Sequence, residues 1–206
     1  MGFISKLLLP RQVDFNESLL DQAKNCRSIV EDLCAACAAN DMGLLSTIPA
    51  TAQQGRELKD RNMALLLDVF ITPYDKESIY RMITGLDWVA LSVKHFQLET
   101  RVYQLHSLSE YAPIMSLLAD MAAALESGIR ELPARQLPPI GNSTDRIHDQ
   151  YDEVVSLCAR ANAELLAQDD LKRIMRHRDM LLQLKEIAKR IHLAANTLED
   201  MAIKVT

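Results

Sequence analysis

The chain has 206 residues, of which 49% are hydrophobic and 25% are charged, so it can bury the core of one domain or of two small fused domains. Six Gly, seven Pro and few aromatic residues, beside abundant Leu and Ala, favour long helices over sheets. A formal net charge of −5 without any run of Lys or Arg argues against nucleic acid as a partner.

The sequence carries no signal for the membrane or for export. No apolar run approaches the roughly 18 uncharged residues that a spanning helix needs, so we expect a chain that is not membrane-spanning. The opening MGFISKLLLP is too short for a leader and lacks a small-residue cleavage site, and Lys6 stands where myristoylation requires Ser or Thr. We therefore expect a cytoplasmic protein.

The first predicted helix begins at Asp14, which is placed to cap it, with Glu17 as the partner three residues on. Apolar residues then repeat at alternating spacings of four and three, as in a long amphipathic helix. They are Leu19, Ala23, Cys26, Val30, Leu33 and Cys37. Residues 40–43 end this helix, and the stretch LLSTIPATAQQG separates it from a second helix over about residues 54–70.

Four cysteines, Cys26, Cys34, Cys37 and Cys158, are too few for a secreted disulfide scaffold, so a reducing compartment fits. Cys34 and Cys37 have C-x-x-C spacing, but they lie in an apolar helical pattern without a neighbouring βαβ unit. We interpret them as small residues facing a core rather than as a redox or zinc motif.

The stretch Thr72-Pro73-Tyr74-Asp75 combines a helix stop with a helix start. Pro73 lacks an amide donor and disfavours the α conformation at Thr72, so the second helix must end there. Either Thr72 caps a third helix with Pro73 in its first turn, or Asp75 caps a helix that begins at Lys76. The apolar repeat that follows carries the third helix past Phe96 towards His106.

The second half repeats this plan. We expect helices over about residues 111–132, 144–168 and 169–204, with the Pro-rich PARQLPPIGN as a break between the first two. The prediction is an all-α architecture of six helices in two three-helix bundles, with halves at about residues 12–106 and 109–206 of one domain. Apolar stripes left over on such long helices also suggest a homo-oligomer.

Two segments resemble a known family. The corner FITPYDKESIY is similar to FITPFDREDIY of the PhoU-like family of accessory or regulatory proteins of the Pit-type phosphate transporter, and ANTLED near the C-terminus is similar to its closing VANTLEDIV. The resemblance spans nearly the whole chain. It implies a fold of two three-helix bundles and a role in phosphate transport, while the corner motif itself mainly specifies a helix junction.

The resemblance also implies acidic Glu-x-x-x-Asp motifs, which hold multinuclear metal clusters in PhoU proteins because carboxylates four residues apart share one helix face. Here the equivalent positions do not carry that motif. They are Ala52 and Arg56, Tyr151 and Val155, and Lys185 and Lys189 in three helices, with Asp87 followed by Trp88, Leu91 and Lys94 in a fourth. We therefore expect no metal and no cofactor.

An alternative remains if this alignment slips by a residue or a turn. Glu57 with Asp60, or Asp149 with Asp152 and Glu153, would then form a residual acidic face. We favour solvated surface for all five. His148 follows Asp145 by three residues, but the further motifs of a di-metal bundle site are not evident.

No catalytic arrangement stands out: the sequence has no G-x-S-x-G motif, no Gly-rich phosphate loop and no Cys-His pair in a recognisable context. The other histidines, His95, His106, His177 and His192, suit surface or interior helix positions. We expect a non-enzymatic regulator or accessory protein that binds a phosphate permease or another membrane transporter through helix contacts. The alternatives are a metal-binding helical bundle and an oligomeric scaffold without transporter contact.

Overall fold

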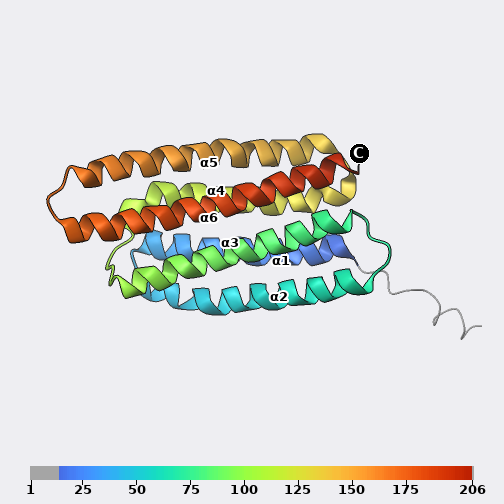
Figure 1. The fold of residues 1–206 in the computed structure, drawn as a ribbon, viewed down its shortest axis with the longest axis horizontal. Helices are drawn as coiled ribbons and strands as arrows, with labels where there is room; N and C mark the ends of the chain where they lie inside the picture. The colour runs from blue at the N-terminus through green and yellow to red at the C-terminus, as the bar shows by residue number, and fades with distance from the viewer. Residues whose placement is uncertain (1–13, 206) are drawn as a thin grey trace, which may run out of the picture.

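The computed structural model describes residues 14–205, and all regular structure in that range is helical. Six α-helices are joined by short turns (Figure 1). Their bounds are α1 Phe15–Ala39, α2 Ile48–Asp68, α3 Lys76–Val102, α4 Ala112–Glu131, α5 Leu137–Leu166 and α6 Leu171–Ile203. Three short 3-10 helices, Met42–Thr47, Ser109–Tyr111 and Leu132–Ala134, lie in the connections. The all-α prediction with six helices is confirmed.

The helices form two groups of three. Helices α1, α2 and α3 pack on one another, as do α4, α5 and α6, and the two groups are joined lengthwise through α1 against α4 and α3 against α6. Figure 1 shows α2 and α5 at opposite edges of this arrangement, with α1, α3, α4 and α6 between them. The predicted pair of three-helix bundles is therefore present.

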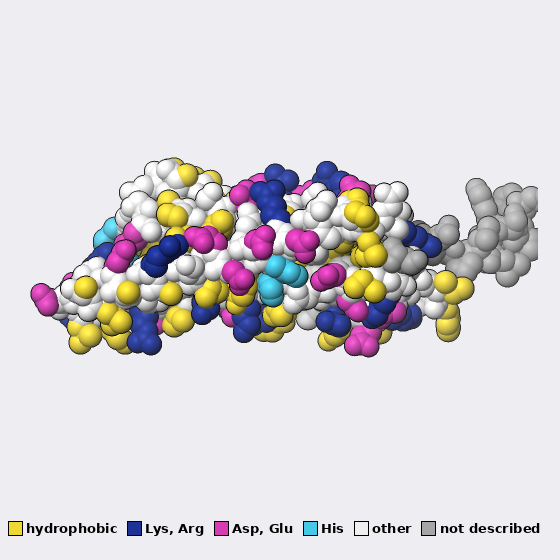
Figure 2. Space-filling model, turned by 90° about the horizontal axis from the view of Figure 1, so that it is seen from above, with side chains coloured by type: hydrophobic (Ala, Val, Ile, Leu, Met, Phe, Trp, Pro, Cys, Tyr) yellow, Lys and Arg dark blue, Asp and Glu magenta, His cyan; other side chains and the backbone are white. Residues whose placement is uncertain are grey.

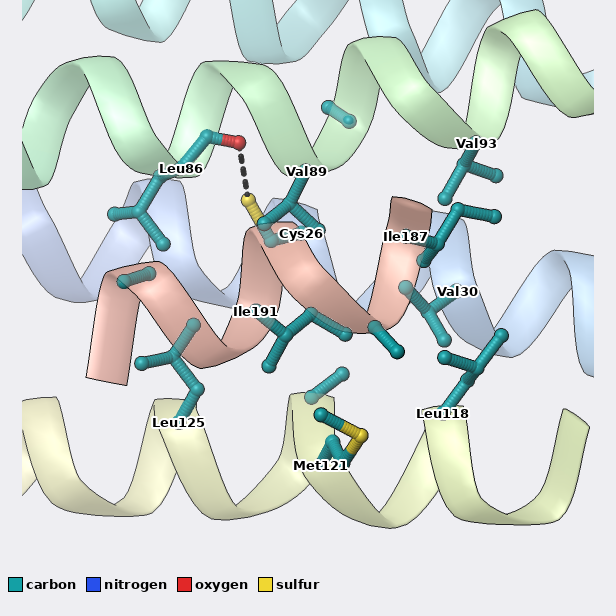
Figure 3. Close-up of a cluster of buried hydrophobic side chains, with 14 of the residues drawn as sticks. Cys26, Val30, Leu86, Val89, Val93, Leu118, Met121, Leu125, Ile187 and Ile191 are labelled. Carbon is teal, nitrogen blue, oxygen red and sulfur yellow. Dashed lines mark hydrogen bonds between the residues drawn. The ribbon is translucent and has the colours of Figure 1, made fainter. Parts of the chain in front are cut away.

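The core runs across the boundary between the groups. Figure 3 shows Val30 of α1, Val93 of α3, Leu118 of α4 and Ile187 of α6 pointing towards one another, and all four are completely buried. Because each such side chain contributes roughly 1.5–3 kcal/mol when it leaves water, the shared core binds the two groups firmly. The apolar stripes predicted for the first and third helices supply much of it.

The cysteines belong to this core. All four are free, and Cys26 Sγ donates to the Leu86 carbonyl at 3.0 Å (Figure 3). Cys34 and Cys37 donate in the same way to the carbonyls of Met115 and Leu108, each at 3.1 Å. Burial raises the pKa of the Cys34 thiol to about 12, which keeps it protonated and unreactive. The C-x-x-C spacing is therefore part of helix packing.

Two helices begin earlier than the sequence indicated. The second starts at Ile48, not near residue 54, and the fifth starts at Leu137, not near residue 144. In both places a proline that we interpreted as part of a break lies in the first helical turn. Proline has no amide to donate, and the first turn needs none, so the segment starts a helix instead of separating two.

One helical stretch, Ser109–Ala134, is long and apolar enough to cross a membrane by length and composition, with a mean hydropathy of 1.3. More than half of its most apolar window, 56%, is buried within the protein. It contains α4, which packs against α1, α5 and α6. The core helix of a globular bundle has the same properties.

Candidate functional site

The corner between α2 and α3 is the most distinctive local structure. Helix α2 ends at Asp68, and Thr72 Oγ1 donates to the Tyr74 carbonyl at 2.6 Å, which tightens the turn. Asp75 then caps α3 by accepting the Ser78 amide at 3.0 Å. Of the two capping alternatives, the one with Asp75 is confirmed, and Pro73 lies before the helix rather than inside it.

A tyrosine ties this corner to the start of α1. Tyr74 is only 6% exposed, and its hydroxyl donates to Asn16 Oδ1 at 2.6 Å. Burial raises the pKa of Tyr74 to about 12, so the phenol keeps its proton at neutral pH. A residue that looked like part of a turn therefore connects segments 58 positions apart.

The other side of the corner is bound to the end of α6. The buried Ser78 hydroxyl lies 2.5 Å from Asp75 Oδ2 and 2.9 Å from Asp200 Oδ2, so it can donate to either carboxylate. Lys204 Nζ donates to both carboxylates, at 3.2 Å to Asp75 and 2.9 Å to Asp200. The two segments that resemble the PhoU-like family thus meet in space.

The charges at this junction are well satisfied. The Ser78 hydroxyl and amide, together with Lys204, lower the pKa of Asp75 to about 2. Lys204 is also the main cause that lowers the pKa of Asp200, and the two carboxylates raise the pKa of Lys204 in return. The cluster is consequently fully ionised at neutral pH and acts as a cross-link rather than as an acid or a base.

Near this cross-link, three large apolar side chains are exposed to solvent. Leu67 is 85% exposed, Phe70 is 99% exposed and Ile71 is 88% exposed. We call these three residues the corner tip. Large exposed apolar groups held on a rigid frame are typical of a binding surface, because their removal from water by a partner releases free energy without much ordering cost.

The metal-motif positions of α2 and α3 do meet, but they carry the wrong chemistry for a cation. A hollow of about 110 Å³ is lined by Ala52, Gln53, Arg56, Asp87, Leu91 and Lys94. Arg56 Nε lies 3.2 Å from Asp87 Oδ1, and Lys59 Nζ lies 3.6 Å from Asp87 Oδ2. A single carboxylate already neutralised by two basic groups is a poor ligand set for a divalent ion.

The residual acidic residues do not form one site. Glu57 and Asp60 are exposed on α2, and Asp149, Asp152 and Glu153 are exposed on α5 at the opposite edge of the molecule (Figure 1). Gln53 donates to Glu57 at 3.2 Å, and Arg160 pairs with Glu153 at 2.9 Å. Within residues 14–205, no group of three or more His, Cys, Asp or Glu side chains is placed to hold a metal ion.

A histidine pair between α5 and α6 was not apparent from the sequence. The rings of His148 and His192 are 4.7 Å apart, and the Tyr151 ring is 4.6 Å from that of His192. Burial, reinforced by the neighbouring His148, lowers the pKa of His192. Figure 2 shows histidine side chains among acidic ones on the α5 side of the molecule. The two residues lie far apart along the chain, and the antiparallel packing of α5 on α6 brings them together.

His177 lies in a separate polar network towards the other end of α6. Its Nδ1 is 2.5 Å from the Tyr111 hydroxyl, and Arg173 donates to its Nε2 at 2.8 Å. Arg173 also pairs with Glu110 at 2.9 Å. Because Nε2 accepts from a guanidinium, the ring is neutral with its proton on Nδ1. His95 and His106 are exposed on α3 and in the connection that follows it.

The similarity of this chain to known proteins is found in its fold and not in its sequence. No protein-family model matches the sequence, and no curated protein matches it. A solved structure of a PhoU-like protein from Shewanella oneidensis MR-1 is similar, with a TM-score of 0.80 and 15% identity, covering 93% of this chain and 100% of that one.

Two further solved structures have a similar fold. One is a putative PhoU-like phosphate regulatory protein from Shewanella oneidensis MR-1, with a TM-score of 0.79 and 16% identity over 93% of this chain and 100% of that one. The other is the phosphate transport system regulatory protein PhoU from Streptococcus pneumoniae, with a TM-score of 0.66 and 14% identity over 89% of this chain and 91% of that one. This chain therefore shares the fold of PhoU-like phosphate regulatory proteins.

Proposed function

We propose that this protein is a non-enzymatic, cytoplasmic regulator or accessory protein of inorganic phosphate transport, with a Pit-type permease as its partner. The observation that carries the proposal is the near full-length likeness to the fold of PhoU-like phosphate regulatory proteins. The resemblance of the corner and closing segments adds the permease type. A purely oligomeric scaffold and a metal-binding bundle are the competing functions.

The corner tip is the contact surface in this proposal. Leu67 projects from the end of α2, and Phe70 and Ile71 project from the connection to α3. The Tyr74 side chain binds this corner to α1, and the Ser78 side chain binds it to α6. Asp68, Asp75, Lys76 and Glu77 flank the tip with charges of both signs. Mixed charge around an apolar centre suits an apolar pocket with a polar rim on a protein partner.

The two helical halves, about residues 12–106 and 109–206, act together as a single PhoU-like domain in this proposal. The core shared by α1, α3, α4 and α6 supports it, because the halves cannot separate without exposing those side chains. The junction of Asp75 with Lys204 also couples the corner to the end of the chain. Binding at the corner tip would therefore affect both halves.

Regulation without a metal cluster is part of the proposal. The Arg56–Asp87–Lys59 arrangement supports it, since basic groups occupy the place where acidic ligands would converge. Elemental analysis of protein dialysed first against a chelator and then against mixed iron, zinc and manganese is the check. Retention of two or more ions per chain, lost when Glu57, Asp60 or Glu153 is mutated, would favour the metal-binding alternative.

The transporter contact is tested by replacing Phe70 and Ile71 with Ser together. We expect at least about a tenfold loss of permease recovered in pull-downs from native membranes, because central apolar anchors are typically worth 2 kcal/mol or more each. Leu44→Ser is the matched control, since Leu44 is also an exposed apolar residue, 41% exposed, in a different connection.

A photo-crosslinking residue at position 70 then identifies the partner directly. Crosslinks to a phosphate permease support the proposal. If position 70 crosslinks only to a second copy of this chain, the scaffold function replaces it. If recovery of the permease is equal for both Ser variants, the corner tip is not the contact surface.

A further inference from the structure

A second surface lies on the outer side of α6, far from the corner tip. Four apolar side chains there are exposed although they belong to a long ordered helix. They are Leu171 at 68%, Met175 at 52%, Leu182 at 53% and Leu193 at 43% exposed. We call them the α6 outer line. At about 100° per residue they fall within roughly 40° of one another around the helix, so they lie along one side of it and form an apolar strip with gaps.

The strip is flanked by basic residues. Arg178 and Lys189 lie within about 60° of the same direction, and both are exposed. Between residues 171 and 190 the helix carries seven Lys or Arg residues against two acidic ones, in a chain whose net charge is −5. Two of these seven basic residues, Arg178 and Lys189, lie on the same face as the apolar strip.

Helix α5 has the opposite character. It carries five acidic residues against two Arg, and its outward face in Figure 2 shows mainly acidic side chains with histidines. Along the lower edge of the same view, hydrophobic and Lys or Arg side chains predominate, with some acidic ones among them. Helix α6 is thus more basic than α5 between residues 171 and 190, and a negatively charged partner would approach the α6 side.

The shape of the molecule favours the approach of a negatively charged partner to the α6 side. The turn that joins α5 to α6 extends beyond the ends of the other helices (Figure 1). Leu166, at the end of α5, is 71% exposed and adds an apolar side chain close to this turn. Helices α3 and α6 lie side by side.

We propose that the outer face of α6 binds the surface of an anionic phospholipid membrane. An apolar strip flanked by Lys and Arg is the arrangement by which helices lie in the plane of an interface, with aliphatic side chains at the headgroup boundary and basic groups at the phosphates. This goes beyond the proposed transporter contact.

The test is co-sedimentation of the full chain with vesicles of phosphatidylcholine alone and of phosphatidylcholine with 30% phosphatidylglycerol. We expect binding to the anionic vesicles that weakens as salt is added. The single tryptophan, Trp88, supplies a second readout. It is 41% exposed, and the Arg190 guanidinium carbon lies 4.7 Å from its ring at the α3–α6 seam, so its emission should shift to the blue on binding.

Charge reversal distinguishes binding through this face from non-specific electrostatic attraction. Arg178→Glu with Lys189→Glu should lower binding at least about tenfold, because each basic residue near an anionic surface contributes roughly a fivefold gain. Arg146→Glu with Arg160→Glu, on α5, changes the net charge equally and should leave binding almost unchanged. The ion pairs lost in this control, to Asp120 and Glu153, lie at the surface and contribute little stability.

Met175→Ser with Leu182→Ser should lower binding several-fold at constant charge, and circular dichroism should show that every variant is folded. Equal loss in the two charge-reversed variants, or binding to neutral vesicles as strong as to anionic ones, would overturn the proposal. So would binding that requires membrane proteins in the vesicles. Phe70→Ser with Ile71→Ser should still bind vesicles, which keeps this result independent of the transporter contact.

Discussion

The α2–α3 corner and the α5–α6 turn are the same junction in the two halves of the molecule, each leading from the second to the third helix of its group. Both stop one helix and cap the next with an aspartate, Asp75 in the first half and Asp170 in the second. They differ in what else these residues contact, and that difference explains why one of them has so distinctive a sequence.

The corner is held by partners far away in the chain. Tyr74 reaches Asn16 at the start of α1, and Asp75 and Ser78 reach Lys204 and Asp200 at the end of α6. Tyr74, Asp75 and Ser78 therefore each satisfy a local and a long-range requirement at once. Few side chains meet both, and a recognisable motif is the consequence.

The α5–α6 turn is held mostly by neighbours. Asp170 accepts the Arg173 amide at 3.0 Å, and Arg173 Nε donates to Gln168 Oε1 at 3.0 Å. The remote contacts of this turn include the pair of Arg173 with Glu110. A turn that depends on local capping tolerates many sequences, which leaves its exposed side chains free to serve another purpose.

The largest expected difference concerns the two caps. Asp75→Ala should lower the free energy of unfolding by about 2 kcal/mol, because it removes a helix cap together with hydrogen bonds to Ser78 and Lys204. Asp170→Ala removes the local cap and should cost about 1 kcal/mol. Urea unfolding followed by circular dichroism at pH 7 measures both values.

Asp75→Asn is the control for this pair, since asparagine caps a helix as well as aspartate but carries no charge. It should recover most of the stability lost in Asp75→Ala, because the contact between Asp75 and Lys204 is exposed and so contributes little on its own. Equal losses for Asp75→Ala and Asp170→Ala would contradict the distinction between a cross-linked and a local junction.

The helical pattern could be predicted because it depends on apolar spacing and caps that are close in sequence. Asp14 caps α1 as expected, and the alternating stripe of that helix is buried. The starts of α2 and α5 were wrong because proline ends some helices and begins others, and only the following apolar contacts decide which. Ile48 and Ile140, both completely or almost completely buried, make those contacts.

The candidate surfaces were only partly predictable. The corner was expected to be structural, but nothing in the local sequence indicated that Tyr74 is buried while Phe70 is exposed. The family resemblance identified Arg56 and Asp87 as positions of the metal motif, and the structure shows that they meet. The pairing of His148 with His192 depends on the register between α5 and α6. Apolar stripes left over were foreseen, but their place on α6 depends on how the two groups pack.

The free energy of unfolding measured over a pH series should distinguish the His177 network at one end of the bundle from the Asp75 junction at the other. Burial lowers the pKa of His177 below its usual 6.5, so the neutral ring stabilises the folded state above about pH 6.5 and that contribution is lost as the pH falls below it. The slope reaches at most about 1.4 kcal/mol per pH unit for one proton. His177→Gln should flatten the stability profile between pH 7 and pH 5.

Asp75→Asn should leave that interval unchanged and alter the profile only below about pH 4. The reason is that the pKa of Asp75 is lowered from 3.8 to about 2, so its stabilising contribution is present above pH 3.8 and is lost as the pH falls towards 2. Profiles for the two variants that both run parallel to that of the unmodified chain would show that the titration of neither group is linked to folding.

The smallest expected effect is that of Pro73→Ala. Pro73 is exposed and precedes the capping residue, so its removal breaks no contact between the corner and α1 or α6. Alanine at this position gives the unfolded chain more conformations to lose, which costs about 0.4–1 kcal/mol. Helical circular dichroism should be retained, and urea unfolding should show a slightly lower midpoint with an unchanged slope. A loss larger than that of Asp75→Ala would mean that the corner is determined by its proline and not by its contacts with α1 and α6.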